Sequence, residues 1–141
     1  MADLRDSSIP LPLRWILAHG ITSLTPWYFL DDPESVDGLR NQYRREVSGG
    51  SQPISDCLPF ARRQDNDDVA AFVIVDGVVT AEVIDVHLTW ATGPERPGFP
   101  GFPGLERYPD FWAWFKSAVD ASADWATEDD LDDVISDGPV V

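Results

Sequence analysis

The chain has 141 residues, a common length for one domain, and 43% of them are hydrophobic, which excludes wholesale disorder. Twenty-five Asp and Glu against ten Lys and Arg give a net charge of −15 at pH 7. This balance argues strongly against nucleic-acid binding, which needs a basic surface, and against binding to anionic membranes. It is compatible with a soluble protein that meets basic partners.

The acidic excess lies almost entirely in the second half of the chain. Residues 1–64 hold seven basic and eight acidic residues, whereas residues 65–141 hold three basic and seventeen acidic ones. From Asp120 onward there are eight acids and no base. This asymmetry indicates either a one-sided docking surface or an acidic coat that only keeps the protein in solution.

The compartment is inferred from features that the sequence lacks. Cys57 is the only cysteine, so we expect no intramolecular disulfide, no cysteine-based zinc site and a reducing environment. The first residues show no basic stretch followed by an apolar one, as a signal peptide requires. The longest apolar run, residues 69–75, is far below the roughly 20 residues needed to span a bilayer. We expect a soluble, cytoplasmic protein.

The first quarter of the chain predicts a helix and a short strand. Residues 1–8 are polar, and we expect them to be flexible. Residues 9–18 read as a helix that has Pro10 in its first turn and is followed by Gly20 as the terminating residue. The aromatic residues 26–30 suit a strand.

A second helix is predicted after Asp32, which can cap it, with Pro33 in the first helical position. Its apolar stripe repeats at helical spacing and consists of Val36, Leu39, Tyr43 and Val47. Residues 48–68 read as a long loop that holds the short apolar piece 58–61.

A β-hairpin is the clearest local signal. Residues 69–75 and 78–88 are rich in β-branched side chains, and Asp76-Gly77 separates them. Two residues that tolerate positive φ are what a type I′ turn requires, so we expect Val75 to pair with Val78.

The remaining segments are a loop, a helix and a tail. Residues 91–108 contain four Gly and four Pro and are predicted to be a loop. A third helix is expected from Pro109 to near Trp125, with Trp112 and Val119 widening its apolar face so that it is well buried. The main residues of that face are Phe111, Trp114, Phe115 and Ala118.

The domain layout follows from this order of elements. We expect a flexible segment at residues 1–8, a single domain over 9–126 and an acidic tail over 127–141 that holds one helical turn around residues 131–135. Strands joined by a tight turn, with helices before and after them, predict an α+β fold with a central antiparallel β-sheet flanked by helices.

The residues that could carry chemistry favour structural roles. His19 is at a predicted helix end, where an imidazole commonly meets free carbonyls, and His87 lies in a strand. Neither stands in a recognisable motif with a nucleophile, and Cys57 reads as an inert side chain near the core. No phosphate-binding loop, dinucleotide fingerprint, zinc signature or catalytic triad is present, which favours a binding module over an enzyme without excluding an enzyme.

The segment Asp65-Asn66-Asp67-Asp68 is similar to the start of a calcium loop. Such a loop needs Gly at its sixth position and Glu at its twelfth, where this chain has Ala70 and Asp76. The segment is therefore interpreted as a polar turn that leads into a strand, and we expect no metal there.

Two interpretations stay open for the Gly-Phe-Pro repeat at residues 97–104. It is either a stiff connection whose two Phe side chains pack on the fold, or an exposed aromatic loop that docks a partner. Most of the six Trp residues belong to the core on statistical grounds, while one or two can anchor an interface. Our candidate partner-binding residues are Asp65, Asp67, Asp68, Trp90, Phe99, Phe102, Asp129 and Asp130.

Four segments together resemble the SUKH superfamily, which includes fungal SMI/KNR cell-wall regulators, bacterial Syd proteins and many bacterial toxin-immunity proteins. They are a helix that ends in Ala18-His19-Gly20-Ile21, the aromatic strand at 26–30, the block from Leu58 to Phe72, and the helix that begins within Tyr108 to Phe115. The resemblance implies an α+β fold with a central antiparallel sheet, no cofactor, and a function in protein binding rather than chemistry.

Three functions are compatible with these features. The first is a non-enzymatic immunity protein that neutralises a cognate, basic toxin such as a nuclease. The second is a regulatory or scaffolding protein of the SMI/KNR type with a different protein partner. The third is an enzyme that uses His87 and nearby carboxylates such as Asp85. We favour the first.

Overall fold

The computed structural model describes residues 3–47, 54–87 and 104–137. In chain order the elements are α1 (Leu11–Ala18), β1 (Ser23–Leu24), β2 (Trp27–Phe29), α2 (Pro33–Val47), β3 (Cys57–Arg63), β4 (Asp68–Val75), β5 (Val78–His87), β6 (Gly104–Tyr108), α3 (Phe111–Trp125) and α4 (Glu128–Asp137). The predicted contact residues Trp90, Phe99 and Phe102 lie outside the described residues.

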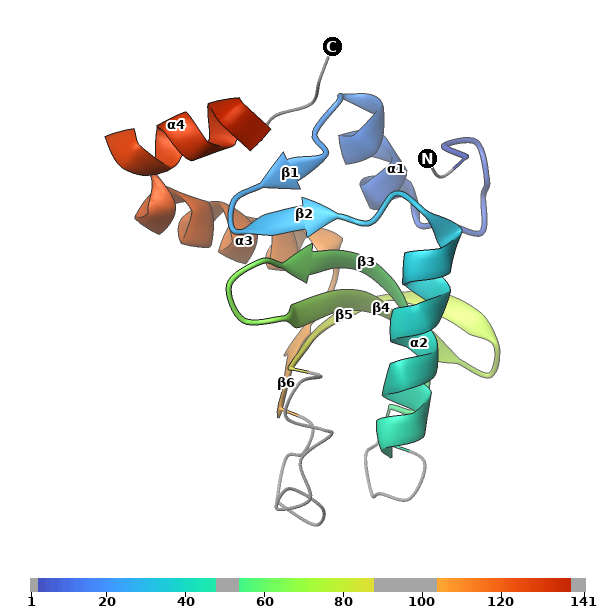
Figure 1. The fold of residues 1–141 in the computed structure, drawn as a ribbon. Coiled ribbons are helices and arrows are strands. Elements are labelled where there is room, and N and C mark those ends of the chain that lie inside the picture. The colour runs from blue at the N-terminus through green and yellow to red at the C-terminus, as the bar shows by residue number, and fades with distance from the viewer. Residues whose placement is uncertain (1–2, 48–53, 88–103, 138–141) are drawn as a thin grey trace.

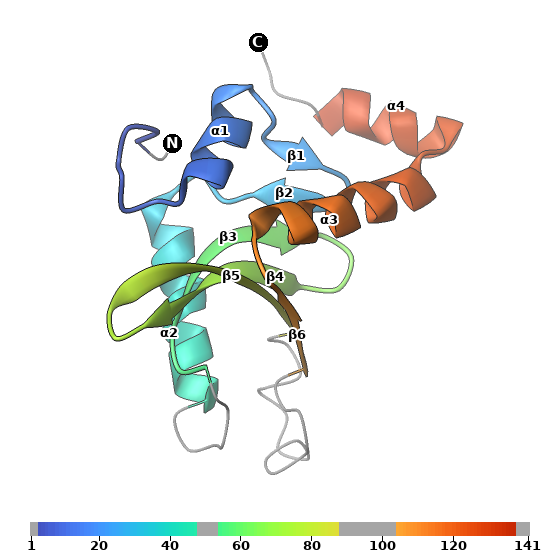
Figure 2. The ribbon, with the colours of Figure 1, turned by 180° about the vertical axis from the view of Figure 1, so that it is seen from behind.

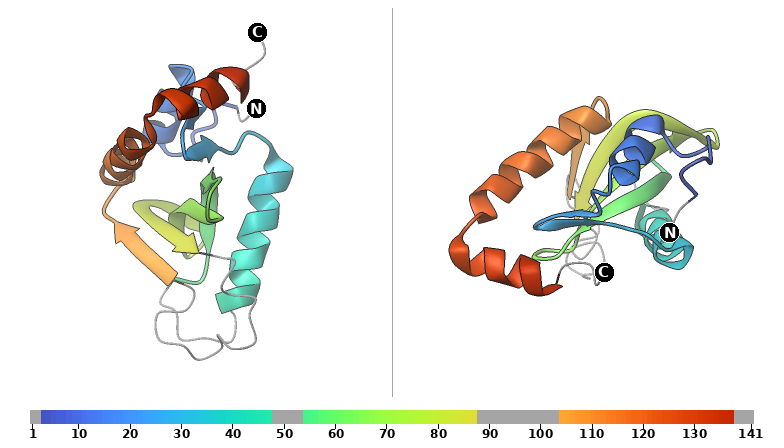
Figure 3. Two further views of the ribbon diagram at one scale, coloured as in Figure 1. Left: turned by 60° about the vertical axis from the view of Figure 1, so that its left-hand side comes forward. Right: turned by 90° about the horizontal axis from the view of Figure 1, so that it is seen from above.

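The six strands form one antiparallel sheet in which each strand pairs with the next one along the chain. Helix α2 covers one face of the sheet (Figure 1), and α1 and α3 lie on the opposite face (Figure 2). The left view of Figure 3 shows the sheet between α2 and α3. The predicted α+β fold, with a central antiparallel sheet flanked by helices, is confirmed.

Local signals place most helix ends where the sequence predicts them. The Asp32 carboxylate accepts a hydrogen bond from the Ser35 amide at 2.9 Å. Asp110 caps α3 in the same way by accepting from the Ala113 amide at 2.9 Å. Gly20 follows α1 with a φ of 80°, a conformation in which other residues are strained.

The hairpin between β4 and β5 is confirmed. Asp76 and Gly77 have φ angles of 51° and 79°, and Val75 pairs with Val78. The aspartate tolerates the left-handed conformation and the glycine adopts it without steric cost.

Two strands lie in segments that the sequence predicts to be loops. Strand β3 contains Pro59, which has no amide proton, and the register with β4 shifts between Pro59 and Ala61. A bulge accommodates such a residue inside a sheet, which explains why the segment is a strand despite its proline. Strand β6 begins at Gly104, directly after the last proline of the Gly- and Pro-rich segment.

Each face of the sheet carries its own hydrophobic core. Under α1 and α3, the fully buried ring of Trp114 stands edge-on to Phe60, with ring centroids 4.9 Å apart, and to Trp27 at 5.2 Å. Under α2, the buried Tyr43 hydroxyl donates to the Ile54 carbonyl at 2.7 Å. Helices α3 and α2 are therefore each attached to the sheet by a large aromatic side chain.

An ion cluster connects α2 to the start of β3. Arg40 and Arg44 each donate two hydrogen bonds to the Asp56 carboxylate, over 2.7 to 2.9 Å. Burial raises the pKa of Asp56, but the hydrogen bonds from the two guanidinium groups outweigh burial and hold that pKa well below its usual range.

Helix α3 is less buried than its composition suggests. Its inner face packs on the sheet through Phe111, Trp114 and Ala118, while Trp112 and Val119 are exposed. The prediction that these two residues widen a well-buried face is wrong, because at about 100° per residue they point away from the inner stripe.

The acidic tail contains a ten-residue helix, α4, where the sequence indicates one turn. The Thr127 hydroxyl accepts from the Asp130 amide at 3.1 Å, and the Thr127 carbonyl accepts from the Leu131 amide at 2.8 Å. Three acids in the first turn favour the helix further, because they lie at the positive end of its dipole.

Candidate functional site

Several polar residues of β4, β5 and β6 lie on the face of the sheet that carries α1 and α3, the face turned to the viewer in Figure 2. Asp68 lies opposite His87, and Asp85 lies opposite both Ala70 and Glu106. Because directly paired residues share a face and Ala70 belongs to the core beneath α1 and α3, all of them face the same side. We call Asp68, Asp85, His87 and Glu106 the polar sheet end.

Electrostatic crowding perturbs the central carboxyl group of the polar sheet end. Burial raises the pKa of Asp85 to about 7, the charges of Asp68 and Glu106 add to the effect, and Arg63 opposes it. The Glu106 carboxylate also accepts a hydrogen bond from the Tyr108 hydroxyl at 2.9 Å. Asp85 therefore exchanges its proton close to neutral pH.

The polar sheet end brings together the two residues named for the catalytic hypothesis. His87 Nδ1 contacts the Asp68 carboxylate, and Asp85 lies on the same face. A carboxylate that orients an imidazole is an arrangement found in general bases, and a carboxyl group with a pKa near 7 can move a proton. This geometry permits proton transfer at the sheet surface.

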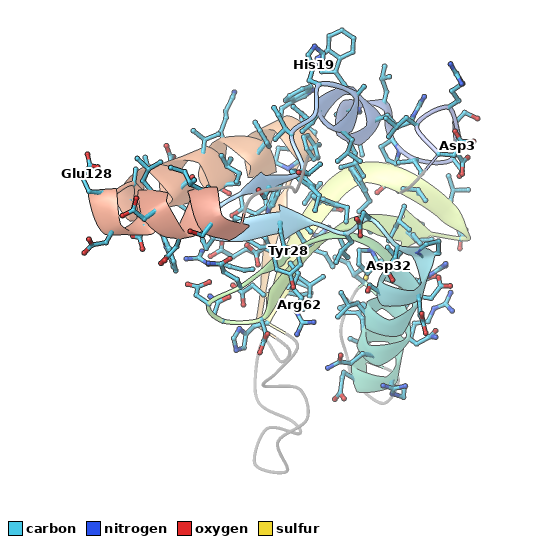
Figure 4. The ribbon with its side chains drawn as sticks, turned by 45° about the horizontal axis from the view of Figure 1, so that its top comes forward. Asp3, His19, Tyr28, Asp32, Arg62 and Glu128 are labelled. Atoms are coloured by element: carbon cyan, nitrogen blue, oxygen red, sulfur yellow. The ribbon has the colours of Figure 1, made fainter. Side chains whose placement is uncertain are left out.

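The other candidate chemical groups have structural positions. Cys57 belongs to the core under α2, on the opposite side of the sheet, and burial raises the pKa of its thiol to about 12. His19 Nδ1 lies 2.8 Å from the Trp15 carbonyl at the end of α1, on the outside of the molecule (Figure 4). Both positions agree with the sequence predictions.

The acids of the turn before β4 have partners within the chain. Asp65 pairs with Arg63 at 2.6 Å, Asp67 pairs with Arg62 at 2.9 Å, and Asp68 contacts His87. The turn itself is formed as expected, with Asp67 at a φ of 61°. Because two arginines compensate this turn, it contributes less net charge to the surface than its sequence suggests. Its role in partner binding stays a prediction.

Asp129 and Asp130 lie at the start of α4, beside a groove that sequence reasoning did not find. The groove has a volume of about 510 Å³ and runs between β1, the end of α3 and α4; we call it the α4 groove. Figures 1 and 4 show α4 next to β1, with Glu128 at its outer end. The residues that line it include Ser23, Leu24, Trp125, Asp130, Leu131 and Val134.

The sequence contains only part of the signal that would predict this groove. Leu131, Val134 and Ile135 repeat at helical spacing in the tail, but their neighbour across the groove, Leu24, is more than a hundred residues away. Only the fold brings α4 next to the first strand.

A second groove, of about 420 Å³, lies between the N-terminal segment, α1, the start of α2 and the hairpin. Apolar side chains such as those of Leu13 and Phe60 line it together with three exposed acids, Asp3, Asp6 and Asp32, which we call the rim acids. Hydrogen bonds from Ser8 lower the pKa of Asp6, and hydrogen bonds from Ser35 lower the pKa of Asp32. These rim acids therefore already serve local turns and a helix cap.

Comparison of the chain with protein-family models, curated proteins and solved structures finds no match. Within residues 3–47, 54–87 and 104–137, no helix is long and apolar enough to cross a membrane. In the same part of the chain, no three His, Cys, Asp or Glu side chains are grouped to hold a metal ion.

Proposed function

We propose that the chain is a non-enzymatic protein-binding domain, and specifically a cytoplasmic immunity protein that neutralises a cognate toxin. The observation that carries the proposal is the charge of the C-terminal helices. Residues 120–137 hold eight acids and no Lys or Arg, and six of these acids belong to α4. The four segments that resemble the SUKH superfamily support the same conclusion.

A nuclease is the toxin class that this charge favours. An enzyme that holds a polyanion needs a basic site, and an acidic protein can cover that site. Complementary charge raises the association rate and disfavours wrong partners. Affinity should then fall steeply between low and moderate salt, and a dissociation constant independent of salt would refute this electrostatic mechanism.

The test is co-expression with the product of the neighbouring open reading frame. For an immunity protein, we expect that frame to encode a secreted protein with a C-terminal toxin module, and we expect this chain to restore growth to cells that express the module. A one-to-one complex should be isolated from the same cells. Growth arrest that persists while the folded chain is abundant refutes the immunity function. Housekeeping neighbours and partners instead favour the regulatory or scaffolding alternative.

One observation favours a second candidate, acid–base catalysis at the polar sheet end. His87 contacts Asp68 beside a carboxyl group, that of Asp85, whose pKa is raised to about 7. The variant His87→Ala separates the two functions. If His87 is a catalytic base, the His87→Ala variant should lose enzymatic activity. If the chain is an immunity protein, the His87→Ala variant should neutralise the toxin as well as the wild type does.

A further inference from the structure

We infer that the α4 groove is the docking site for a basic partner segment that inserts an apolar side chain between flanking Lys or Arg residues. The inference rests on the proposed function, because it names the surface and the partner chemistry through which a protein-binding domain would act. It assigns this role to a groove that the sequence did not reveal.

The apolar part of the site is a stripe on α4 that the core leaves open. Leu131, Val134 and Ile135 are 50%, 43% and 68% exposed, and the first two line the groove. Spacings of three and one residue place all three on one side of the helix. Leu24 of β1 and Trp125 at the end of α3 add apolar surface to the same groove. Clustered exposed apolar side chains in a groove are typical of a protein contact.

The charge around this stripe selects the occupant. The acids of α4 are Glu128, Asp129, Asp130, Asp132, Asp133 and Asp137, and no base interrupts them. A second copy of the chain would bring two such helices together, and the repulsion between their carboxylates disfavours that dimer. A segment with Lys or Arg on both sides of its apolar anchor matches both properties of the groove.

The acids of α4 differ from those of the turn before β4. None of the ion pairs found among the described residues involves an α4 carboxylate. In contrast, Asp65 and Asp67 pair with arginines. Within α4, the Asp130 carboxylate accepts a hydrogen bond from the neutral Thr127 hydroxyl at 2.9 Å. A partner can therefore pair with α4 without first breaking an internal ion pair.

The edge of the sheet offers main-chain groups at the same place. The Phe29 amide donates to the Thr22 carbonyl, and Ser23 lies opposite Tyr28, one step further along β1. Because bonded and non-bonded pairs alternate in an antiparallel ladder, the N–H and C=O of Ser23 point away from β2. Ser23 lines the groove, so the main chain of an extended partner segment can form hydrogen bonds with the Ser23 N–H and C=O. An apolar side chain of the same partner segment can then contact Leu131.

The experiment uses the full chain and three fluorescein-labelled 12-residue peptides. One alternates Lys with Leu, the second replaces Lys by Gln, and the third replaces Leu by Ser. Fluorescence anisotropy at 50 mM and 200 mM NaCl gives each affinity. We expect the Lys–Leu peptide to bind at least tenfold more tightly than either of the others and to weaken with salt, because the groove needs both charge and an apolar anchor.

Paired variants locate the binding. Leu131→Ser with Val134→Ser should weaken the Lys–Leu peptide at least tenfold. The matched control, Val75→Ser with Val78→Ser, removes two valines of the hairpin between β4 and β5 that are more exposed than Leu131 and Val134, and it should not change the affinity. Glu128→Gln with Asp130→Asn, which neutralises the two α4 acids that line the groove, should reduce the salt dependence. Circular dichroism checks that each variant is folded, and amide shifts at Ser23, Leu24 and Trp125 should follow peptide addition in the wild type.

Each outcome decides the inference. Equal binding by the wild type and the groove variant, or shifts confined to another surface, overturns the groove assignment and leaves the proposed function intact. Absence of any Lys–Leu binding also overturns the assignment, and the co-expression test then decides the proposed function separately. A dimer in sedimentation that the groove variant abolishes would show that a second copy is the occupant, which contradicts the inference.

Discussion

Replacing Asp85 with Asn should stabilise the protein at neutral and alkaline pH. Burial and the charges of Asp68 and Glu106 raise the pKa of Asp85 from 3.8 to about 7, with Arg63 as the opposing charge. In the unfolded chain the same carboxyl group has its ordinary pKa. Between these two values the folded protein holds a proton that the unfolded chain releases, so the contribution of Asp85 to stability falls as the pH rises.

The magnitude follows from the size of the shift. Each pH unit between 3.8 and about 7 changes the free energy of unfolding by at most about 1.4 kcal/mol, so the shift of roughly three units sets a ceiling near 4 kcal/mol. The Asp85 side chain is only partly buried, and solvent screening reduces this value. We therefore expect Asp85→Asn to be about 2 kcal/mol more stable than the wild type at pH 8 and nearly equal to it at pH 4.

Urea unfolding followed by tryptophan fluorescence measures this difference from pH 4 to pH 8. Asp120→Asn is the matched control, because Asp120 is exposed and its replacement removes the same charge. The difference between Asp85→Asn and the wild type should grow with pH, whereas the control should show little change. A variant that is less stable than the wild type at pH 8, or a difference independent of pH, would refute the electrostatic reasoning.

Three further predictions concern other parts of the fold. Asp56→Asn should lower the free energy of unfolding by about 2–3 kcal/mol at pH 7, because Arg40 and Arg44 lose their shared carboxylate. Because the pKa of Asp56 is lowered in the folded protein, this loss should shrink as the pH falls below 3.8. Urea unfolding at pH 7 and at pH 3 checks both expectations. Cys57 should not react with a disulfide reagent at pH 8 until urea unfolds the chain, because its thiol is buried with a pKa near 12; rapid reaction of the folded protein would contradict this. Gly77→Ala should cost about 1 kcal/mol in thermal unfolding through its φ of 79° alone, since no atom lies within 4 Å of the added Cβ; an unchanged melting temperature would argue against this turn geometry.

Much of the fold could be predicted from short-range signals. The caps at Asp32 and Asp110 and the Asp76-Gly77 turn act within a few residues, so the sequence alone determines them. Strand β3 was missed because Pro59 argues against a strand, and only pairing on both sides with a bulge overrides it. Strand β6 was missed because it directly follows a Gly- and Pro-rich stretch.

The candidate sites depended more on long-range register. His87 and Asp85 could be named from the sequence, but Glu106 joins them only because β6 pairs with β5. In the sequence, Asp65 and Asp67 belong to an acidic run that is open to a partner. In the fold, each forms an ion pair with an arginine at the end of the preceding strand, β3. Burial and pairing of this kind are set by the complete fold and have no local signature.

The order of the strands has a consequence for how the protein folds. Because every strand of the described sheet pairs with its neighbour in sequence, no pairing has to wait for a strand between its two partners, and three of the five pairings close short loops at a small cost in entropy. The largest gap between consecutive paired strands within the described sheet falls between Phe29 and Cys57, and α2 fills part of it. This nearest-neighbour order keeps the strand pairings more local than in a sheet whose strands cross over one another. The strands can therefore assemble one after another as the polypeptide is synthesised, without waiting for distant segments to arrive.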